Sequence, residues 1–468
     1  MTGRQPGAET AFRVAERLQR LDRPWDVFGE RICRYEVHLN GPEVEMQRGP
    51  IVLEGYGFRE IRPADGGVRV GFAGSTDLTD AGIDRTIEAA GTAGGFSSFP
   101  AKDVALPKAL ESPGTVEGAD PNLWEHPEAA IDRFVEELLA PLEGRKDVRP
   151  SFGSVRVALS EITFANANGV ETRFHRTVAE LEFAVRSVAG PEGPSAGEYW
   201  VNRRSCGLDP QRIAGEVLEW GRKARDARIA SGTPPIHGPV LFPPEVLSDF
   251  LPATLGFRLG GQAALRGMMP PRGSLVGGAN IDLWDDGLYP YGLASAPYDD
   301  EGVPQGKRHL VAAGEFREPI YDILHGKALG ARSTGGGRRN LTTLAPWFHF
   351  MIPPNPGPST MVLSPGDGGS DEEVLEAIGE GIWVDQLGYA FPDPVSSAFG
   401  GEIRLAYLVK GGKRSIPVRG GTVGGVALAG EGESSLLQSV RSLGSAPVLV
   451  GQLSAPTIAV GALTVAGA

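Results

Sequence analysis

The chain has 468 residues, a length that predicts two or three domains at roughly 150 residues per domain. Its formal charge of −13, from 45 basic and 58 acidic residues, argues against a nucleic-acid-binding protein, because such proteins usually present a basic face. With 41% hydrophobic residues, the chain has enough apolar material to build packed cores. Its only cysteines, Cys33 and Cys206, exclude a disulfide scaffold and any site built from several thiolates. The sequence has no signal-peptide pattern and no apolar run of about 18 residues, so we expect a cytoplasmic protein that does not enter membranes.

The first half of the sequence predicts an α/β domain with a mixed or antiparallel sheet. Apolar residues at helical spacing predict helices over 11–21, 77–90, 127–139 and 209–230. Alternating apolar and polar residues predict strands within 32–62, at 68–72, and in a hairpin over 154–188 that turns at 166–169. Two segments rich in Gly, Ser and Pro, 92–122 and 189–197, predict loops.

The second half predicts a strand-rich domain with more glycine and proline. The segment Gly232-Thr233-Pro234-Pro235 ends a predicted helix and has the composition of a linker, so we place the domain boundary at 232. This division gives an N-terminal domain over 1–232 and a C-terminal domain over 233–468. Helices are predicted over 244–266, 318–328, 370–378 and 434–443, and strands over 239–242, 402–410 and 415–423. The expected fold class is therefore α+β with two domains.

Common catalytic motifs are absent from the sequence, including the Walker A loop, G-x-S-x-G and H-E-x-x-H. None of the seven histidines lies three to five residues from another, so the sequence holds no histidine pair with metal-ligand spacing. Carboxylates that could bind a hard cation occur in two clusters, Asp282/Asp285/Asp286 and Asp299/Asp300/Glu301. Neither cluster matches an EF-hand, and Asp299-Asp300-Glu301-Gly302 is ordinary turn chemistry.

A glycine-rich loop runs from Ser333 to Arg339. Its three glycines expose backbone N–H groups and its two arginines add positive charge, a combination that could hold an anion. A lone loop of this kind is more often structural, and we treat the structural role as the main interpretation.

Several segments resemble the TldD/PmbA family of zinc-metalloprotease-related proteins. Residues 296–304, Ala-Pro-Tyr-Asp-Asp-Glu-Gly-Val-Pro, resemble that family's Pro-Phe-Asp-x-Glu-Gly-Val stretch. Further segments agree in the same order, namely 314–329, the Ser-Thr-Gly loop at 333–340, 379–384, 398–421, and the ending at 455–467. The resemblance is specific over 237–468 and looser before it, and it implies a TldD/PmbA-type C-terminal domain.

In the TldD branch of this family a helix carries H-E-x-x-x-H, whose histidines bind zinc while the glutamate can act as general base. The resemblance also implies that, in TldD-branch proteins, a cysteine near the C-terminus supplies the third zinc ligand. The corresponding positions here hold Pro252, Ala253 and Phe257, and no cysteine follows Cys206. The resemblance therefore implies the PmbA branch, also called TldE, whose members lack the zinc site and pair with a TldD-type subunit. Because an interior proline breaks a helix, we also expect an interruption near Pro252.

The first functional hypothesis is a non-catalytic, zinc-free subunit of a heteromeric metallopeptidase that trims unfolded or precursor peptides. We expect no catalytic residue, metal or cofactor in this chain, zinc in the TldD-type partner, and a homodimer when the chain is alone. One alternative is a stand-alone enzyme that cleaves an amide bond or matures a natural product in a repurposed cleft. Another is a homodimeric binding module. The candidate substrate-binding residues are Asp299, Asp300, His325, Arg338 and Arg339.

Overall fold

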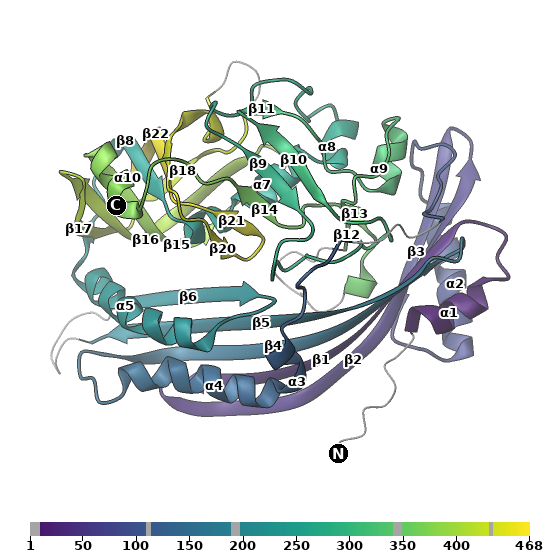
Figure 1. Ribbon diagram of the computed structural model, residues 1–468, viewed down its shortest axis with the longest axis horizontal. Coiled ribbons are helices and arrows are strands. Elements are labelled where there is room, and N and C mark those ends of the chain that lie inside the picture. The colour runs from purple at the N-terminus through teal and green to yellow at the C-terminus, as the bar shows by residue number, and fades with distance from the viewer. Residues whose placement is uncertain (1–9, 109–113, 189–196, 340–348, 430–433) are drawn as a thin grey trace.

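The computed structural model describes residues 10–108, 114–188, 197–339, 349–429 and 434–468. Long strands of the first half form one curved layer, and the shorter strands of the second half are stacked over β4, β5 and β6 (Figure 1). The molecule combines helices with three sheets and a two-stranded ribbon in the described residues, so the predicted α+β class is confirmed.

The N-terminal sheet has six antiparallel strands in the order β3-β2-β1-β4-β5-β6 within the described residues. Its strands are β1 (Trp25–Asn40), β2 (Glu43–Ala64), β3 (Gly67–Ser75), β4 (Val148–Asn166), β5 (Glu171–Ser187) and β6 (Gly197–Ser205). The predicted hairpin is confirmed, since β4 and β5 pair and the side chain of Asn166 accepts the N–H groups of Asn168 and Val170 in the turn. The sequence predicts no strand at 197–205, because the alternation of its apolar residues, the buried Tyr199 and Val201, is too short to indicate one.

Two groups of helices cover this sheet at opposite ends (Figure 1). They are α1 (Thr10–Leu18) and α2 (Asp80–Gly95) at one end, and α3 (Pro121–Glu125), α4 (Pro127–Leu139), η1 (Ala140–Leu142) and α5 (Pro210–Ile229) at the other. Asp209 caps α5 by accepting the N–H of Gln211, and Pro210 occupies its first turn, where no N–H is needed. The loop predicted over 92–122 is shorter than expected, because α2 runs to Gly95 and α3 begins at Pro121.

The C-terminal half contains two larger sheets. One has the order β11-β10-β9-β14-β21-β20 in the described residues. It contains β9 (Leu283–Asp286), β10 (Lys307–Ala312), β11 (Glu315–Phe316), β14 (Met361–Leu363), β20 (Val448–Val450) and β21 (Leu453–Ala455). In the second sheet, strands β8, β22, β18, β16 and β15 close into a ring, because β15 pairs with both β8 and β16. This closure leaves those strands fewer free edges.

The remaining strands belong to the ring, its extensions, or a separate ribbon. The ring is built from β8 (Ile236–Phe242), β15 (Gly381–Ala390), β16 (Ala398–Lys410), β18 (Thr422–Val426) and β22 (Ile458–Ala466). Added to it are β7 (Ser231–Gly232), β17 (Lys413–Arg419) and β19 (Val440–Leu443), while β12 (Gly337–Arg338) pairs with β13 (Asn355–Pro356). The segment predicted as one strand over 415–423 is thus divided between β17 and β18.

Helices of the second half are short. They are α6 (Pro244–Ser248), α7 (Leu251–Arg258), α8 (Gly261–Leu265), α9 (Ile323–Ala328), α10 (Asp371–Ile378), η2 (His349–Met351) and η3 (Leu437–Ser439). The single helix predicted over 244–266 is wrong, because that segment forms three helices. The expected interruption near Pro252 is confirmed, since α7 begins at Leu251 and holds the proline in its first turn.

The helix predicted over 434–443 is also wrong. This segment forms η3 followed by β19, and Val440 pairs with Val460 of β22. The apolar spacing suits a helix, but pairing with a neighbouring strand outweighs that local preference. The helix predicted over 370–378 is confirmed, and a capping box between Ser370 and Glu373 fixes its start.

The two halves share one apolar core. Buried residues of α5 and β5, such as Trp220 and Leu181, lie in the same cluster as Leu241, Trp383 and Leu405 of the second half. β7 at 231–232 pairs in parallel with β17, so the chain enters the C-terminal sheet at the proposed boundary. The division at 232 stays a prediction.

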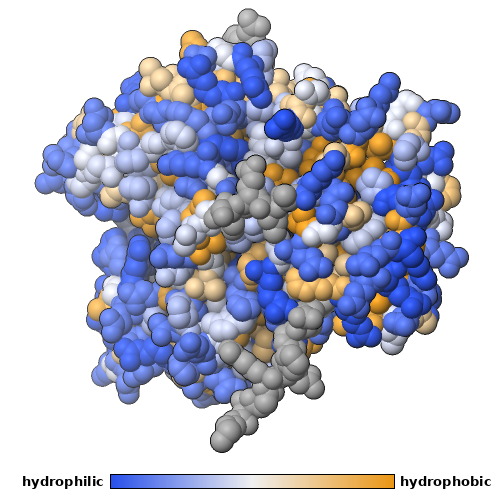
Figure 2. Space-filling model, turned by 45° about the vertical axis from the view of Figure 1, so that its right-hand side comes forward, coloured by the Kyte–Doolittle hydropathy of each residue, from blue (hydrophilic) through white to orange (hydrophobic). Residues whose placement is uncertain are grey.

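Hydrophilic residues cover most of the face in Figure 2, with apolar residues gathered in smaller patches between them. None of the helices described in the structure combines the length and apolar character that a membrane crossing requires.

Candidate functional site

The acidic segment 299–301 is buried between the two halves of the chain. Asp299 forms a turn by accepting the N–H groups of Glu301 (3.0 Å) and Val303 (2.8 Å). Its other oxygen accepts the N–H of Gly337 at 3.0 Å. Burial raises the pKa of Asp299 to about 6, while these N–H groups and the charge of Arg338 oppose the rise. Asp299 therefore has a clear structural role, in keeping with the turn interpretation of this cluster.

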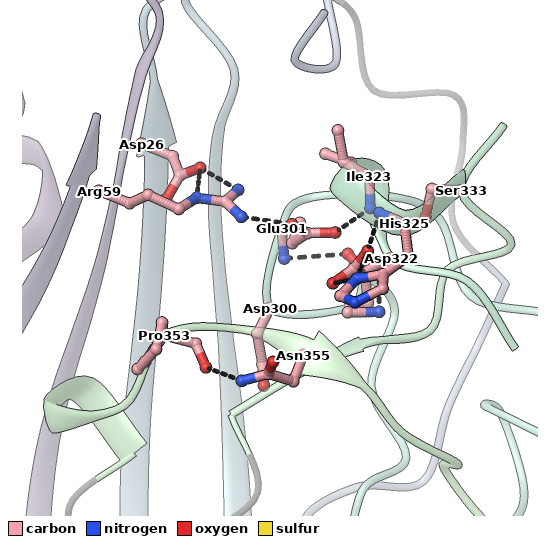
Figure 3. Close-up of polar contacts among 12 residues, drawn as sticks. Asp26, Arg59, Asp300, Glu301, Asp322, Ile323, His325, Ser333, Pro353 and Asn355 are labelled. Atoms are coloured by element: carbon pink, nitrogen blue, oxygen red, sulfur yellow. Dashed lines mark hydrogen bonds and ion pairs between the residues drawn. The ribbon is translucent and has the colours of Figure 1, made fainter. Parts of the chain in front are cut away.

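Glu301 joins the segment to the N-terminal sheet through Arg59 (Figure 3). One Glu301 oxygen accepts Nη1 of Arg59 at 2.6 Å and the other accepts the N–H of Ile323 at 2.7 Å. Arg59 also binds Asp26, its cross-strand neighbour, through Nε at 2.9 Å and through Nη2. All three side chains are at most 1% exposed. A charged chain of three residues thus connects β1 and β2 with the 299–301 segment.

The electrostatics of this chain follow from burial. Burial raises the pKa of Glu301 above its usual value, and Asp322 and Asp299 add to the effect, while Arg59 opposes it. Burial alone would lower the pKa of Arg59, but the charges of Asp26 and Glu301 outweigh it and the net shift is upward. Each member of the chain therefore depends on its partners for compensation.

Arg338 and Arg339 lie in the same buried region. Arg339 donates from Nη1 to the carbonyl of Ile352 at 2.7 Å, and its Nη2 lies 3.7 Å from Asp26. Its guanidinium sits 4.9 Å from the centre of the Phe28 ring, and burial lowers its pKa to about 10. Arg338 donates to the hydroxyl of Ser359. Both arginines are bound within the chain.

The N–H groups of the glycine-rich loop donate hydrogen bonds to acceptors within the protein. Asp299 accepts from Gly337, as described, and Asp300 accepts the N–H of Arg339 at 2.7 Å. The carbonyl of Tyr321 accepts the N–H groups of Thr334 (3.0 Å) and Gly336 (3.1 Å). These donors are not free to bind an anion, so the structure favours the structural interpretation of the loop.

His325 lies on α9, where Asp322 caps the helix. Asp322 accepts the backbone N–H of His325 at 2.6 Å, and its oxygens lie 2.8 and 2.9 Å from Nδ1 of the same residue. The ring packs edge-on against Phe99 at 4.9 Å. The five candidate residues therefore lie in one buried region. His325 is linked to the acidic segment through Asp322 and the contact between Glu301 and Ile323 (Figure 3). As substrate-binding residues they stay predictions.

The other acidic cluster, at 282–286, is also engaged in contacts within the chain. Asp285 binds Arg308 and accepts the N–H of Ser359 at 2.7 Å, while Asp282 lies 3.0 Å from Nε2 of His309. Among the described residues, no group of three or more His, Cys, Asp or Glu side chains is placed to hold a metal. Neither acidic cluster therefore supports a cation site.

The resemblance found in the sequence places the family's zinc-motif positions on α7. Pro252 and Phe257 are half-buried and Ala253 is exposed, so these three positions share the partly open side of the helix. The guanidinium of Arg266 lies 5.5 Å from the centre of the Phe257 ring. None of the three side chains has an atom that binds zinc.

Sequence reasoning missed an open pocket beside the glycine-rich loop. It has a volume of about 290 Å³ and is lined by Arg272, Glu318, Pro319, Tyr321, Ala331, Arg332, Ser333 and Thr334. Only Ser333 and Thr334 belong to the loop that the sequence singled out. Ala331 and Arg332 directly precede that loop, and Glu318, Pro319 and Tyr321 lie in the 314–329 segment. Arg272 comes from a separate segment, and no motif in the sequence connects it with the others.

The long antiparallel sheet, the shared core and the strand-rich second half define an α+β protein of a known architecture. The solved structure of TldE from Thermococcus kodakarensis has the same fold, with a TM-score of 0.74, 21% identity, and coverage of 97% of this chain and 100% of that one. Residues 236–467 match the family model of the PmbA/TldA metallopeptidase C-terminal domain. The chain belongs to the TldD/PmbA family.

Two relatives extend this similarity along the sequence. The protein MJ0231 of Methanocaldococcus jannaschii is 24% identical over 324 residues, which cover 66% of this chain and 72% of that protein. Metalloprotease PmbA of Escherichia coli O157:H7 is 24% identical over 374 residues, which cover 76% of this chain and 75% of that protein. The resemblance inferred from the sequence is confirmed at the level of the family.

Proposed function

We propose that this chain is the zinc-free, PmbA/TldE-like subunit of a two-subunit metallopeptidase that trims unfolded or precursor peptides. In this proposal a TldD-type partner carries the zinc and the general base, and the present chain completes the substrate chamber. The single observation that supports it is α7, the helix that the sequence resemblance aligns with the family's zinc helix, which presents Pro252, Ala253 and Phe257. These side chains can shape a chamber by packing, but they cannot bind a metal or accept a proton.

An exposed apolar patch beside α7 supports a partner on this side of the molecule. Tyr389 and Phe391 are 69% and 65% exposed, and their rings stack at 5.1 Å. Val395 is also exposed, and its carbonyl accepts Nη1 of Arg258 at the end of α7. Exposed aromatic residues of this kind are typical of interfaces.

Apolar residues of β16 offer no such surface. Leu405, Tyr407 and Val409 alternate along the strand, but they are buried within this chain in the core shared with α5. The proposed partner contact therefore rests on the aromatic patch at 389–395.

The direct test is to purify the chain alone and together with a TldD-type chain that carries H-E-x-x-x-H. We expect the mixture to form a heterodimer with one zinc per pair, and to hydrolyse an unfolded peptide much faster than either chain alone. Light scattering after size exclusion, elemental analysis and a peptidase assay measure these three properties. One zinc per isolated chain, with peptidase activity that a chelator removes, would overturn the proposal.

A variant pair tests the proposed contact surface. Tyr389→Asp combined with Phe391→Asp should weaken the heterodimer at least tenfold, because two charged groups replace apolar ring surface. The matched control is Phe96→Asp, which changes a 91% exposed ring at the end of α2, in the N-terminal half. Equal effects of the two changes would show that the 389–395 patch is not the interface.

A further inference from the structure

We propose that the pocket lined by Arg272 and Arg332 binds the free carboxylate at the end of a short peptide. The choice of a peptide rests on the proposed function, whereas the recognition of a carboxylate rests on the pocket itself. The pocket volume of about 290 Å³ is at the lower end of the range of about 300–1,000 Å³ that small-molecule sites occupy. It therefore suits one or two residues of a peptide rather than a long segment.

The two arginines give the pocket its positive character. Arg272 comes from the loop after α8 and Arg332 from the loop after α9, and both are exposed. Neither forms an ion pair with any residue in the described ranges of the chain, in contrast to the nearby Arg317, which lies 2.9 Å from Glu315. A guanidinium presents a planar fork of N–H donors that matches a carboxylate, so two uncompensated forks on one pocket favour such a ligand.

A phenol on the pocket wall adds a neutral donor. Tyr321 is largely buried, and burial raises the pKa of its hydroxyl although the positive charge of Arg272 opposes the rise. The hydroxyl therefore keeps its proton and can donate a hydrogen bond to an anionic oxygen. A desolvated donor of this kind contributes more than one in open water.

The pocket is rigid on the side formed by the loop. The N–H of Tyr321 donates to the hydroxyl of Thr334 at 2.8 Å, and the carbonyl of Tyr321 accepts the N–H groups of Thr334 and Gly336. The hydroxyl of Ser333 also donates to that carbonyl at 3.1 Å. These contacts fix Tyr321 against the loop before any ligand arrives, which lowers the entropy cost of binding.

The negative charge of Glu318 makes the pocket more suitable for a carboxylate than for a phosphate. Glu318 lines the same pocket, so the net formal charge of its side chains is +1. A single carboxylate matches that charge, while a phosphate with nearly two negative charges would also face the Glu318 carboxylate. Glu318 is in addition an acceptor for the amide N–H that precedes a peptide's terminal carboxylate.

Binding of small probes to the full-length chain tests the proposal by calorimetry or NMR. The probes are N-acetyl-alanyl-alanine with a free carboxylate, the same dipeptide as its C-terminal amide, and inorganic phosphate. We expect the free carboxylate to bind at least tenfold more tightly than the amide or phosphate. Equal binding of the acid and the amide, tighter binding of phosphate, or no binding of the acid would each overturn the proposal.

Charge-removing variants place the binding in this pocket. Arg272→Gln and Arg332→Gln should each weaken binding of the acid at least tenfold, and the double variant should abolish it. Lys327→Gln is the matched control, because Lys327 is an exposed cation on α9 that does not line the pocket. An equal loss in the control would show a general charge effect and overturn the site. These measurements use no partner subunit, so they can fail while the proposed heterodimer stands, and the reverse also holds.

Discussion

The N-terminal sheet and the 299–339 segment of the second half are held together by different forces. In the sheet, successive strands pair along most of their length, and apolar residues such as Leu181 and Phe183 fill the core beneath it. In the 299–339 segment, side-chain carboxylates act as the acceptors. Asp299 accepts the N–H of Gly337, and Asp300 accepts the N–H of Arg339. The sheet therefore has many interchangeable bonds, whereas the 299–339 segment depends on a few charged side chains.

The two regions meet at Arg59, which belongs to the sheet but binds Glu301. A buried charge that loses its partner costs much more than an exposed one, because no water replaces the lost contact. This difference predicts that single changes at the meeting point will destabilise the protein more than changes of the same chemistry on the sheet's helices.

The largest effect is expected for Arg59→Met, which removes the cation that binds the buried carboxylates of both Asp26 and Glu301. We expect a loss of about 3–5 kcal/mol in the free energy of unfolding, measured by chemical denaturation. The control is Arg133→Met, which breaks a half-exposed pair with Glu137 on α4 and should cost less than about 1 kcal/mol. Similar losses in both variants would remove the proposed difference between the two regions.

A smaller effect is expected where the 299–339 segment touches the sheet by packing. Gly302 has a φ of +76°, and a Cβ atom built there would lie 2.6 Å from Cε1 of Phe164 on β4. Gly302→Ala should therefore combine backbone strain with a steric clash, and overpacking alone typically costs about 1–3 kcal/mol.

Gly66→Ala separates the two contributions to that loss. Gly66 has a φ of +80°, but a Cβ atom there meets nothing within 4 Å. Its substitution should therefore show the strain without the clash. If thermal or chemical unfolding gives the same loss for both variants, the contact between Gly302 and Phe164 does not contribute to stability.

The smallest expected effect is on reactivity and not on stability. Cys206 follows β6, is fully buried, and donates from Sγ to the carbonyl of Gly292 at 3.1 Å, so it joins the sheet to the second half. Burial raises the pKa of its thiol to about 11. Because the thiolate is the reactive form and appears only as the pH approaches that value, Cys206 should resist alkylation at pH 8.

Cys33 serves as the internal reference for this experiment because it is half-buried. Mass spectrometry after brief alkylation should find Cys33 modified well before Cys206, and both modified in denaturant. Equal rates under native conditions would mean that the contact between the two halves opens readily, contrary to the shared core described above.

The sequence by itself determined the elements whose signals are local. Helical spacing and caps predict α1, α2, α4, α5 and α10, and alternation with a turn at 166–169 predicts the long β4–β5 hairpin. Pro252 predicts the break before α7, because proline restricts its own backbone wherever the chain folds. The family could likewise be inferred from short segments of the second half that occur in the same order as in the family, and residues 236–467 match its model.

Only the tertiary structure decided the features that depend on distant partners. Arg59 and Glu301 are 242 residues apart, and no spacing in the sequence connects them. The strand β19 was predicted as a helix because its pairing with β22 is absent from any local pattern. The pocket lined by Arg272 and Arg332 also depends on the tertiary structure, because only the fold brings these two exposed arginines together. Local periodicity shows which face of an element is apolar. A buried charge, in contrast, is tolerated only where the fold brings a compensating partner to it, and a pocket forms only where the fold brings its walls together.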